Sequence, residues 1–151
     1  EVEERGQGML TGGLPGYRIY QTADGRYLAV AALEPKFWDP FVEAIGAPEL
    51  KGKGVLTGQA GQEVARQLAR IIEARTFQEW SEFLKNIDVC VDPIWSLDEI
   101  LESELHRARQ IFFELNGVTH LRTPLTPVDM KHEPAPEKGA HNDEIFGTKS
   151  D

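Results

Sequence analysis

The chain has 151 residues, 40% hydrophobic and 27% charged, which suits one ordinary domain with a core. Its 16 Lys and Arg against 25 Asp and Glu give a net charge of −9, which disfavours a nucleic-acid partner. No run approaches the roughly 18 apolar residues of a membrane span, and no signal-peptide pattern opens the sequence. The single cysteine, Cys90, excludes an internal disulfide and fits a reducing compartment, so we expect a cytoplasmic protein.

The chain opens with a glycine-rich stretch, residues 1–16, that cannot form regular structure and predicts an extended linker. Residues 17–21 and 26–31 are rich in β-forming residues. Between them, Asp24 followed by Gly25 is a strong hairpin signal, because glycine accepts a positive φ. The first regular element is therefore predicted to be an antiparallel hairpin.

Helices are expected next, where apolar residues recur at a spacing of three and four positions. The first begins at Pro35, where the missing N–H is not needed, and ends at Gly46, which suits a C-terminal cap. The second carries its apolar stripe on residues 64–72. Two later helices each begin with a capping box, in which a hydroxyl residue precedes a glutamate by three positions. These boxes are Thr76 with Glu79 and Ser96 with Glu99.

Two short strands are also predicted, over residues 89–91, where Pro93 stops the strand, and over residues 111–115. Residues 123–151 carry four prolines and few apolar residues, so they cannot bury enough surface to fold alone. This end is expected to be disordered or packed on another body. The sequence thus predicts an α+β fold in three parts: a linker over residues 1–16, a small domain over residues 17–122 and a C-terminal tail over residues 123–151.

Motifs for metal, phosphate or nucleophilic chemistry are absent from the sequence. The four histidines, His106, His120, His132 and His141, lack the spacing of metal ligands, so no metal site is expected. The last two lie in the irregular end and are expected to be solvated. Cys90 lies between two valines, which favours a buried, unreactive thiol. No phosphate-binding loop and no nucleophile elbow occurs.

Glu34 is the candidate functional residue. It follows a hydrophobic strand and immediately precedes Pro35 and a helix, and such strand ends deliver polar side chains to sites. The helix N-terminus would favour the ionised carboxylate. Spacing alone leaves two interpretations open: a carboxylate that merely starts a helix, which is the more common case, or an active-site group.

Several blocks of the sequence, in matching order, resemble the α-methylacyl-CoA racemases of the family III CoA-transferase superfamily. The chain has a T-A-D-G turn, a strand and then L-E-P-K-F, which is similar to the family's G-A-I/L-E-P-K/Q-F. It departs from the usual pattern at Ala31, Asp92 and residues 140–142. The blocks that carry the resemblance are residues 5–17, 20–38, 88–94, 96–99, 107–109 and 139–145.

The resemblance covers nearly the whole chain, but family members are more than twice as long. It therefore implies that this chain is the small-domain portion of a family III enzyme, with a large Rossmann-like domain preceding it. The catalytic His and Asp of the racemases belong to that absent part, so no residue here inherits their roles. The chain alone is accordingly expected to be inactive, and the full-length enzyme is expected to form an interlocked homodimer.

The resemblance also implies a role for three residues. The family's glutamate at the position of Glu34 hydrogen-bonds the catalytic histidine, and Tyr17 and Leu33 match positions that line the acyl pocket. The implied reaction is a 1,1-proton transfer at the α-carbon of 2-methylacyl-CoA thioesters, in lipid metabolism. No metal or organic cofactor is implied, since CoA is part of the substrate.

Two alternatives remain. An enzyme of the same fold could transfer CoA between carboxylic acids, although the L-E-P-K-F-W block favours a racemase. The chain could instead be a stand-alone, non-enzymatic binding module. The glycine-rich start and the proline-rich end argue against such a module, because both resemble crossings to a second body.

Overall fold

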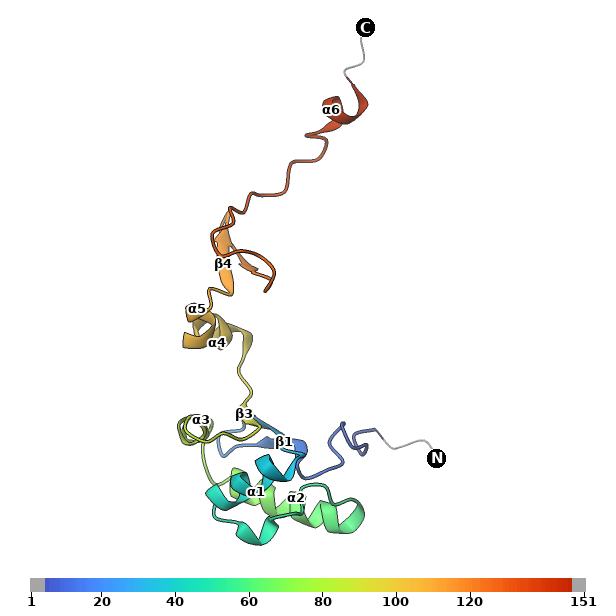
Figure 1. Cartoon of the computed structure of the whole chain (residues 1–151), viewed down its shortest axis with the longest axis vertical. Helices are drawn as coiled ribbons and strands as arrows, with labels where there is room; N and C mark the ends of the chain where they lie inside the picture. The colour runs from blue at the N-terminus through green and yellow to red at the C-terminus, as the bar shows by residue number, and fades with distance from the viewer. Residues whose placement is uncertain (1–4, 148–151) are drawn as a thin grey trace. The chain divides into compact units, whose positions relative to one another are not determined.

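The structure, a computed structural model, describes residues 5–147. The chain divides into two compact units, Glu1–Ile94 and Trp95–Asp151, which we call the first and the second unit. Figure 1 follows the chain through both. The division falls inside the range 17–122 that the sequence assigned to one domain. Whether that range acts as one domain stays a prediction, as do the roles of linker and tail.

The first unit contains a three-stranded antiparallel sheet of β1 (Tyr17–Gln21), β2 (Tyr27–Ala31) and β3 (Val91–Pro93), in that order. The predicted hairpin is present, and Gly25 takes a φ of +78° in its turn. The third strand lies two residues later than predicted. It includes Pro93, opposite Leu28, because a proline is tolerated in an edge strand such as this one.

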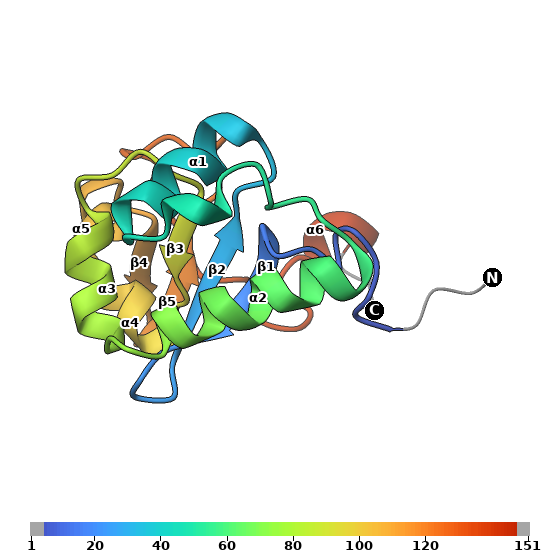
Figure 2. The same cartoon turned by 90° about the horizontal axis from the view of Figure 1, so that it is seen from below.

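Four helical segments complete the first unit: α1 (Pro35–Ala44), the short 3-10 helix η1 (Pro48–Leu50), α2 (Gly58–Ile72) and α3 (Phe77–Leu84). The views in Figures 1 and 2 place α1 and α2 on the same side of the sheet. The predicted capping box at the start of α3 is present, with reciprocal bonds between Thr76 and Glu79. α1 begins at Pro35 as the sequence predicts.

The core of the first unit lies between the sheet and these helices. The strands contribute alternate residues, so Leu28 and Val30 of β2 and Val91 of β3 are buried, while Ile19 and Tyr27 on the other face are exposed. The indoles of Trp38 and Trp80 are buried and donate to the carbonyls of Leu50 (2.7 Å) and Ile72 (2.9 Å), respectively. Because these polar groups are paired, both tryptophans bury their rings without an unsatisfied donor.

The hairpin turn is tied to α3 by one carboxylate. Asp24 accepts hydrogen bonds from the Thr22 hydroxyl (2.6 Å) and from the backbone N–H of Phe77 (3.0 Å), the first residue of α3. The bond from Thr22, followed by the bond from Phe77, lowers the pKa of Asp24 below its ordinary value despite partial desolvation. Asp24 therefore joins two elements that are about fifty residues apart in the sequence.

The entry to β1 is also fixed. The buried Tyr20 hydroxyl donates to the carbonyl of Pro15 (2.7 Å), and burial raises the pKa of Tyr20. The N–H of Gly16 donates to the carbonyl of Gly54 (2.8 Å). A Cβ at Gly16 would lie 2.9 Å from the carbonyl oxygen of Ala32, so only glycine allows this close approach. The entry segment is thereby held against the end of β2.

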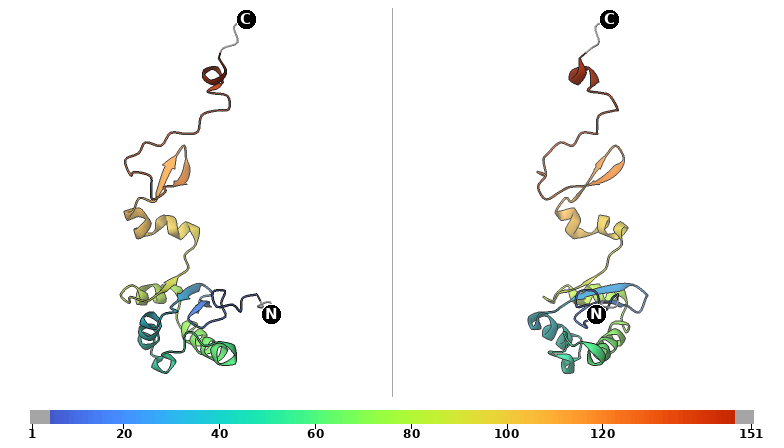
Figure 3. Two further views of the ribbon diagram at one scale, coloured as in Figure 1. Left: turned by 45° about the vertical axis from the view of Figure 1, so that its right-hand side comes forward. Right: turned by 90° about the vertical axis from the view of Figure 1, so that its right-hand side faces the viewer.

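The second unit consists of α4 (Leu97–Glu102), α5 (Glu104–Ala108), β4 (Phe112–Leu115), β5 (Val118–Leu121) and α6 (Asn142–Phe146). The predicted capping box of Ser96 and Glu99 starts α4. β4 and β5 form a hairpin, seen as a short ribbon in Figure 3, whose turn residues Asn116 and Gly117 both have positive φ. The sequence did not predict β5, α5 or α6.

None of the residues of the second unit that the structure describes, 95–147, is buried. Many of its large apolar side chains are exposed to solvent, including those of Leu97, Leu105, Leu121, Leu125 and Phe146. Local bonds hold its elements: the Arg122 guanidinium donates to the carbonyls of Gln110 (3.1 Å) and Pro127 (2.7 Å). The unit thus has secondary structure without a core of its own.

Candidate functional site

The end of β2 delivers a carboxylate to the surface at a fixed backbone position. After β2 ends at Ala31, Ala32 is buried, Leu33 is half-buried and Glu34 is exposed. Glu34 precedes a proline and therefore keeps an extended conformation, φ −82° and ψ 138°, as the N-cap of α1. Its carbonyl accepts the N–H groups of Phe37 (2.9 Å) and Trp38 (3.0 Å). The backbone of Glu34 is thus held by the helix and the buried Trp38.

The side chain of Glu34 is not used by the helix. It makes no capping hydrogen bond, and it is 62% exposed. Its carboxylate oxygen Oε2 lies 3.6 Å from the Lys36 ammonium. Among residues 5–147, no hydrogen bond engages the other oxygen. A fixed backbone that presents an accessible carboxylate can accept an N–H donor from another body.

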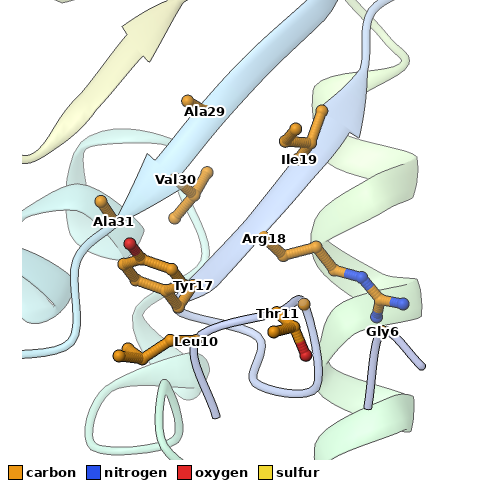
Figure 4. Close-up of a pocket in the computed structure, with 10 residues that line it drawn as sticks. Gly6, Leu10, Thr11, Tyr17, Arg18, Ile19, Ala29, Val30 and Ala31 are labelled. Atoms are coloured by element: carbon orange, nitrogen blue, oxygen red, sulfur yellow. The ribbon is translucent and has the colours of Figure 1, made fainter. Parts of the chain in front are cut away.

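Tyr17 and Leu33 line different hollows of the first unit. Tyr17 is half-buried and lies opposite Ala31 in the β1–β2 register, in a hollow of about 530 Å³ on the outer face of the sheet. Figure 4 shows its ring directed toward the end of β2, with Arg18 pointing away from it. This hollow is otherwise mostly apolar, and Leu10, Ile19 and Ala29 share its walls.

Leu33 lines a smaller hollow of about 340 Å³ with Met9, Leu14 and Val55. The glycine-rich entry segment contributes to both hollows, through Leu10 to the first and through Met9 to the second. Within the residues that the structure describes, Tyr17 and Leu33 therefore do not share one hollow. Both hollows adjoin the segment between the end of β2 and α1, and both offer apolar surface.

The cysteine and the histidines do not contribute to either hollow or to the surroundings of Glu34. Cys90 is partly exposed rather than buried, and its carbonyl accepts the N–H of Ala31 (2.8 Å). His132 was expected to be solvated, but its ring stacks on Phe113 with 3.9 Å between the ring centroids. His106 and His120 also stack on phenylalanines, Phe112 and Phe113. Within residues 5–147, no group of three or more His, Cys, Asp or Glu side chains could hold a metal ion.

No helix in the described part of the chain is both long enough and apolar enough to cross a membrane. Two side-chain contacts were not predicted from the sequence: the contact of Lys36 with Glu34 at the candidate site, and, in the hairpin turn away from the site, the hydrogen bond that Asp24 accepts from the N–H of Phe77. Asp24 lies in a recognised turn motif, but nothing local indicates that its partner is Phe77.

Known proteins resemble this chain over most of its length. The model of the family described as CoA-transferase family III matches residues 1–142. Alpha-methylacyl-CoA racemase of Homo sapiens is 30% identical over 147 residues, which cover 94% of this chain and 38% of the racemase. The racemase of Mus musculus is 31% identical over 110 residues, covering 73% of this chain and 29% of that protein. The chain thus spans less than two fifths of these relatives.

A second kind of enzyme is also similar. The probable fatty acyl-CoA transferase Rv3272 of Mycobacterium tuberculosis (strain ATCC 25618 / H37Rv) is 24% identical over 137 residues, covering 82% of this chain and 34% of that protein. A crystal structure of Rv3272 matches with a TM-score of 0.68 at 20% identity, over 89% of this chain and 39% of that one. This structural likeness supports the α+β fold.

Proposed function

This chain belongs to CoA-transferase family III, and from that membership we propose that it is the small-domain portion of an acyl-CoA racemase. The family resemblance drawn from the motifs is thereby confirmed, whereas the reaction is our proposal. Identity of 30% to the human racemase over 94% of the chain supports it. In the proposed reaction, a base removes the α-proton of a 2-methylacyl-CoA thioester, and an acid on the opposite face returns a proton to the same carbon.

The observation that carries the proposal is the accessible carboxylate of Glu34 on a fixed backbone. Proton removal from a weakly acidic α-carbon turns a catalytic imidazole into an imidazolium. A carboxylate that accepts the other ring N–H of that imidazole orients the ring and stabilises the imidazolium. Glu34 has a free oxygen for such a bond within the described chain, and its helix does not compete for it.

Tyr17 and Leu33 would supply apolar surface to the acyl chain. Each lines an open hollow of the first unit beside the segment that carries Glu34. Closing such surfaces over a thioester removes water and strengthens the electrostatic interactions inside. Neither residue has a proton-transfer role in this proposal. No cofactor is required, because CoA is part of the substrate.

The proposed partner of this chain is a large Rossmann-like domain of the same enzyme, which would carry the catalytic His and Asp. The relatives extend well beyond the matched region, since the chain spans 38% of the human racemase. The second unit also needs another protein surface to pack against. None of its described residues is buried, so apolar burial within the unit cannot offset the conformational entropy lost on ordering it.

We further propose that the full-length enzyme is an interlocked homodimer in the cytoplasm and does not bind nucleic acid.

The second candidate function is CoA transfer between carboxylic acids. Similarity to the fatty acyl-CoA transferase Rv3272, at 24% identity over 82% of the chain, favours it. In that reaction, the thioester bond is broken and remade on an acceptor carboxylate, while the α-proton stays in place. The two functions therefore differ in which bond of the substrate is exchanged.

Incubation of the full-length enzyme with a 2-methylacyl-CoA in deuterated water separates these functions. A racemase incorporates one deuterium at the α-carbon with loss of stereochemical purity, and it needs no acceptor acid. A transferase forms a new acyl-CoA only when a second carboxylic acid is added. CoA transfer without α-exchange would contradict the racemase proposal. The 151-residue chain alone is expected to do neither, and α-exchange by it would refute the assignment of the acid and base to another domain.

A further inference from the structure

Lys36 is an unexpected residue for the first turn of α1. The partial positive charge of a helix N-terminus favours carboxylates there and disfavours cations. The first turn of α1 nevertheless contains no acidic residue, and Lys36 follows Pro35 directly. The family pattern has Lys or Gln at this position, so the lysine is a feature of this chain that helix stability does not explain. A local rule that is broken without a stability gain points to a function for the residue that breaks it.

The ammonium of Lys36 makes two contacts that fix its place. Its Nζ lies 3.6 Å from Oε2 of Glu34 and 4.7 Å from the centroid of the Phe37 ring. The aromatic face attracts the cation, so Phe37 helps hold Lys36 beside Glu34. Both charged side chains are largely exposed. An exposed ion pair of this kind contributes only about 0–1 kcal/mol, so fold stability does not account for a lysine at this position.

We propose that Lys36 is a positioning residue for the carboxylate of Glu34. The inference rests on the proposed function, in which Glu34 faces a catalytic imidazole across a closed cleft. Closing the cleft removes water from the carboxylate, which disfavours its ionised form. Lys36 supplies a cation that is already in place, and the same pair becomes stronger in the drier surroundings. Because Lys36 faces Oε2, the other oxygen is left for the imidazole N–H.

The chain offers a matched control, a lysine that pairs with a glutamate of the same helix. Lys51 pairs with Glu43, near the other end of α1, at 2.8 Å, and both of these side chains are exposed. This pair is closer than that of Lys36 with Glu34 but has no part in the proposed site. A general effect of removing a surface lysine beside α1 would therefore appear equally in Lys51→Gln.

The test is a double-mutant cycle in the full-length enzyme, with kcat, KM and thermal midpoint measured for each variant. Turnover is followed on whichever of the two reactions the enzyme catalyses. We expect Lys36→Gln to lower kcat about 3- to 30-fold with little change in KM or midpoint. Lys36→Arg should keep most of the activity, because the cation remains. Lys51→Gln should match the unmodified enzyme.

The decisive comparison is made in the Glu34→Gln background. There, Lys36→Gln should change kcat less than about twofold, because the carboxylate that Lys36 would position is absent. Unchanged kcat in Lys36→Gln, or an equal fold-loss with and without Glu34, would overturn the role of Lys36 while leaving the proposed function in place. Full turnover in Glu34→Gln alone would instead remove Glu34 from the proposed function, and the role of Lys36 with it.

Discussion

Leu28 in the first unit has no exposed surface, while Leu125 in the second is 94% exposed. Each leucine is typical of its unit. The first unit packs a sheet and helices around buried tryptophans, whereas the second unit has helices and a hairpin but no buried residue among those described. Both units carry good local signals, including a complete capping box each. Local signals therefore specify elements, but only shared apolar burial makes a unit stable by itself.

This difference bears on function, because the candidate site lies on the unit that has a core. Glu34 needs a backbone that stays in place when a partner approaches, and α1 and Trp38 supply it. The second unit has the exposed apolar side chains expected of a segment that packs on another body. On the proposed function, the first unit would present side chains and the second would pack on the proposed large domain.

Replacing a leucine in each unit gives the largest expected contrast. Leu28→Ala should destabilise the isolated chain by about 2–5 kcal/mol, because it leaves a cavity at the centre of the sheet. Leu125→Ala should change stability by less than about 0.5 kcal/mol. Denaturant unfolding measures both. A large loss in Leu125→Ala would show that the second unit has a core of its own.

Amide hydrogen exchange on the isolated chain tests the same contrast without mutation. Amides in β2 and α2 should exchange only through global unfolding, whereas those in residues 97–121 should exchange through local opening at little cost. Residues 123–147 should be the least protected. Uniform protection across residues 97–147 in a dilute monomer would contradict the account of the second unit.

Asp24 links stability of the first unit to pH. Its pKa is lowered in the folded chain, so its carboxylate stabilises the fold above its ordinary pKa near 4, and that stabilisation is lost as the pH falls through the folded value. Asp24→Asn should lower the thermal midpoint at pH 7 by a few degrees and flatten the fall in midpoint below pH 4. Asp129→Asn is the control. If the thermal midpoint fell equally below pH 4 in both variants, the role of Asp24 would be contradicted.

The two capping boxes give the smallest expected contrast. Thr76→Ala should cost about 1 kcal/mol of global stability, because α3 belongs to the packed first unit. Ser96→Ala removes an equivalent hydroxyl from α4, where it should lower helix content without moving the cooperative transition. Circular dichroism with thermal unfolding separates these outcomes. A matching shift of the transition in Ser96→Ala would mean that α4 unfolds with the first unit.

Elements with short-range signals were predictable from the sequence. The Asp24–Gly25 turn, Pro35 at the start of α1 and both capping boxes depend on neighbouring residues, and the structure confirms them. β5 was missed although the Asn116–Gly117 turn that precedes it is a hairpin signal, because its residues alternate weakly and none is buried. α5 and α6 have five residues each, too few to show a helical period.

The site was predictable only in part. The sequence places Glu34 between a strand and a helix, and the structure finds it there as the N-cap of α1. The separate hollows of Tyr17 and Leu33 depend on where the entry segment puts Leu10 and Met9, which no local pattern encodes. The roles of these residues in catalysis stay predictions, because the His and Asp that they would meet belong to the proposed large domain.

Turnover of the full-length enzyme with Glu34→Gln tests the central claim most directly. The substitution keeps the size and a hydrogen-bonding group but removes the charge that would stabilise an imidazolium. We predict a fall in kcat of about 10- to 1,000-fold, or about 1.4–4 kcal/mol of barrier, with a thermal midpoint that moves by no more than about a degree. A folded Glu34→Gln enzyme with unchanged kcat would contradict the account and leave Glu34 as a residue that only begins a helix.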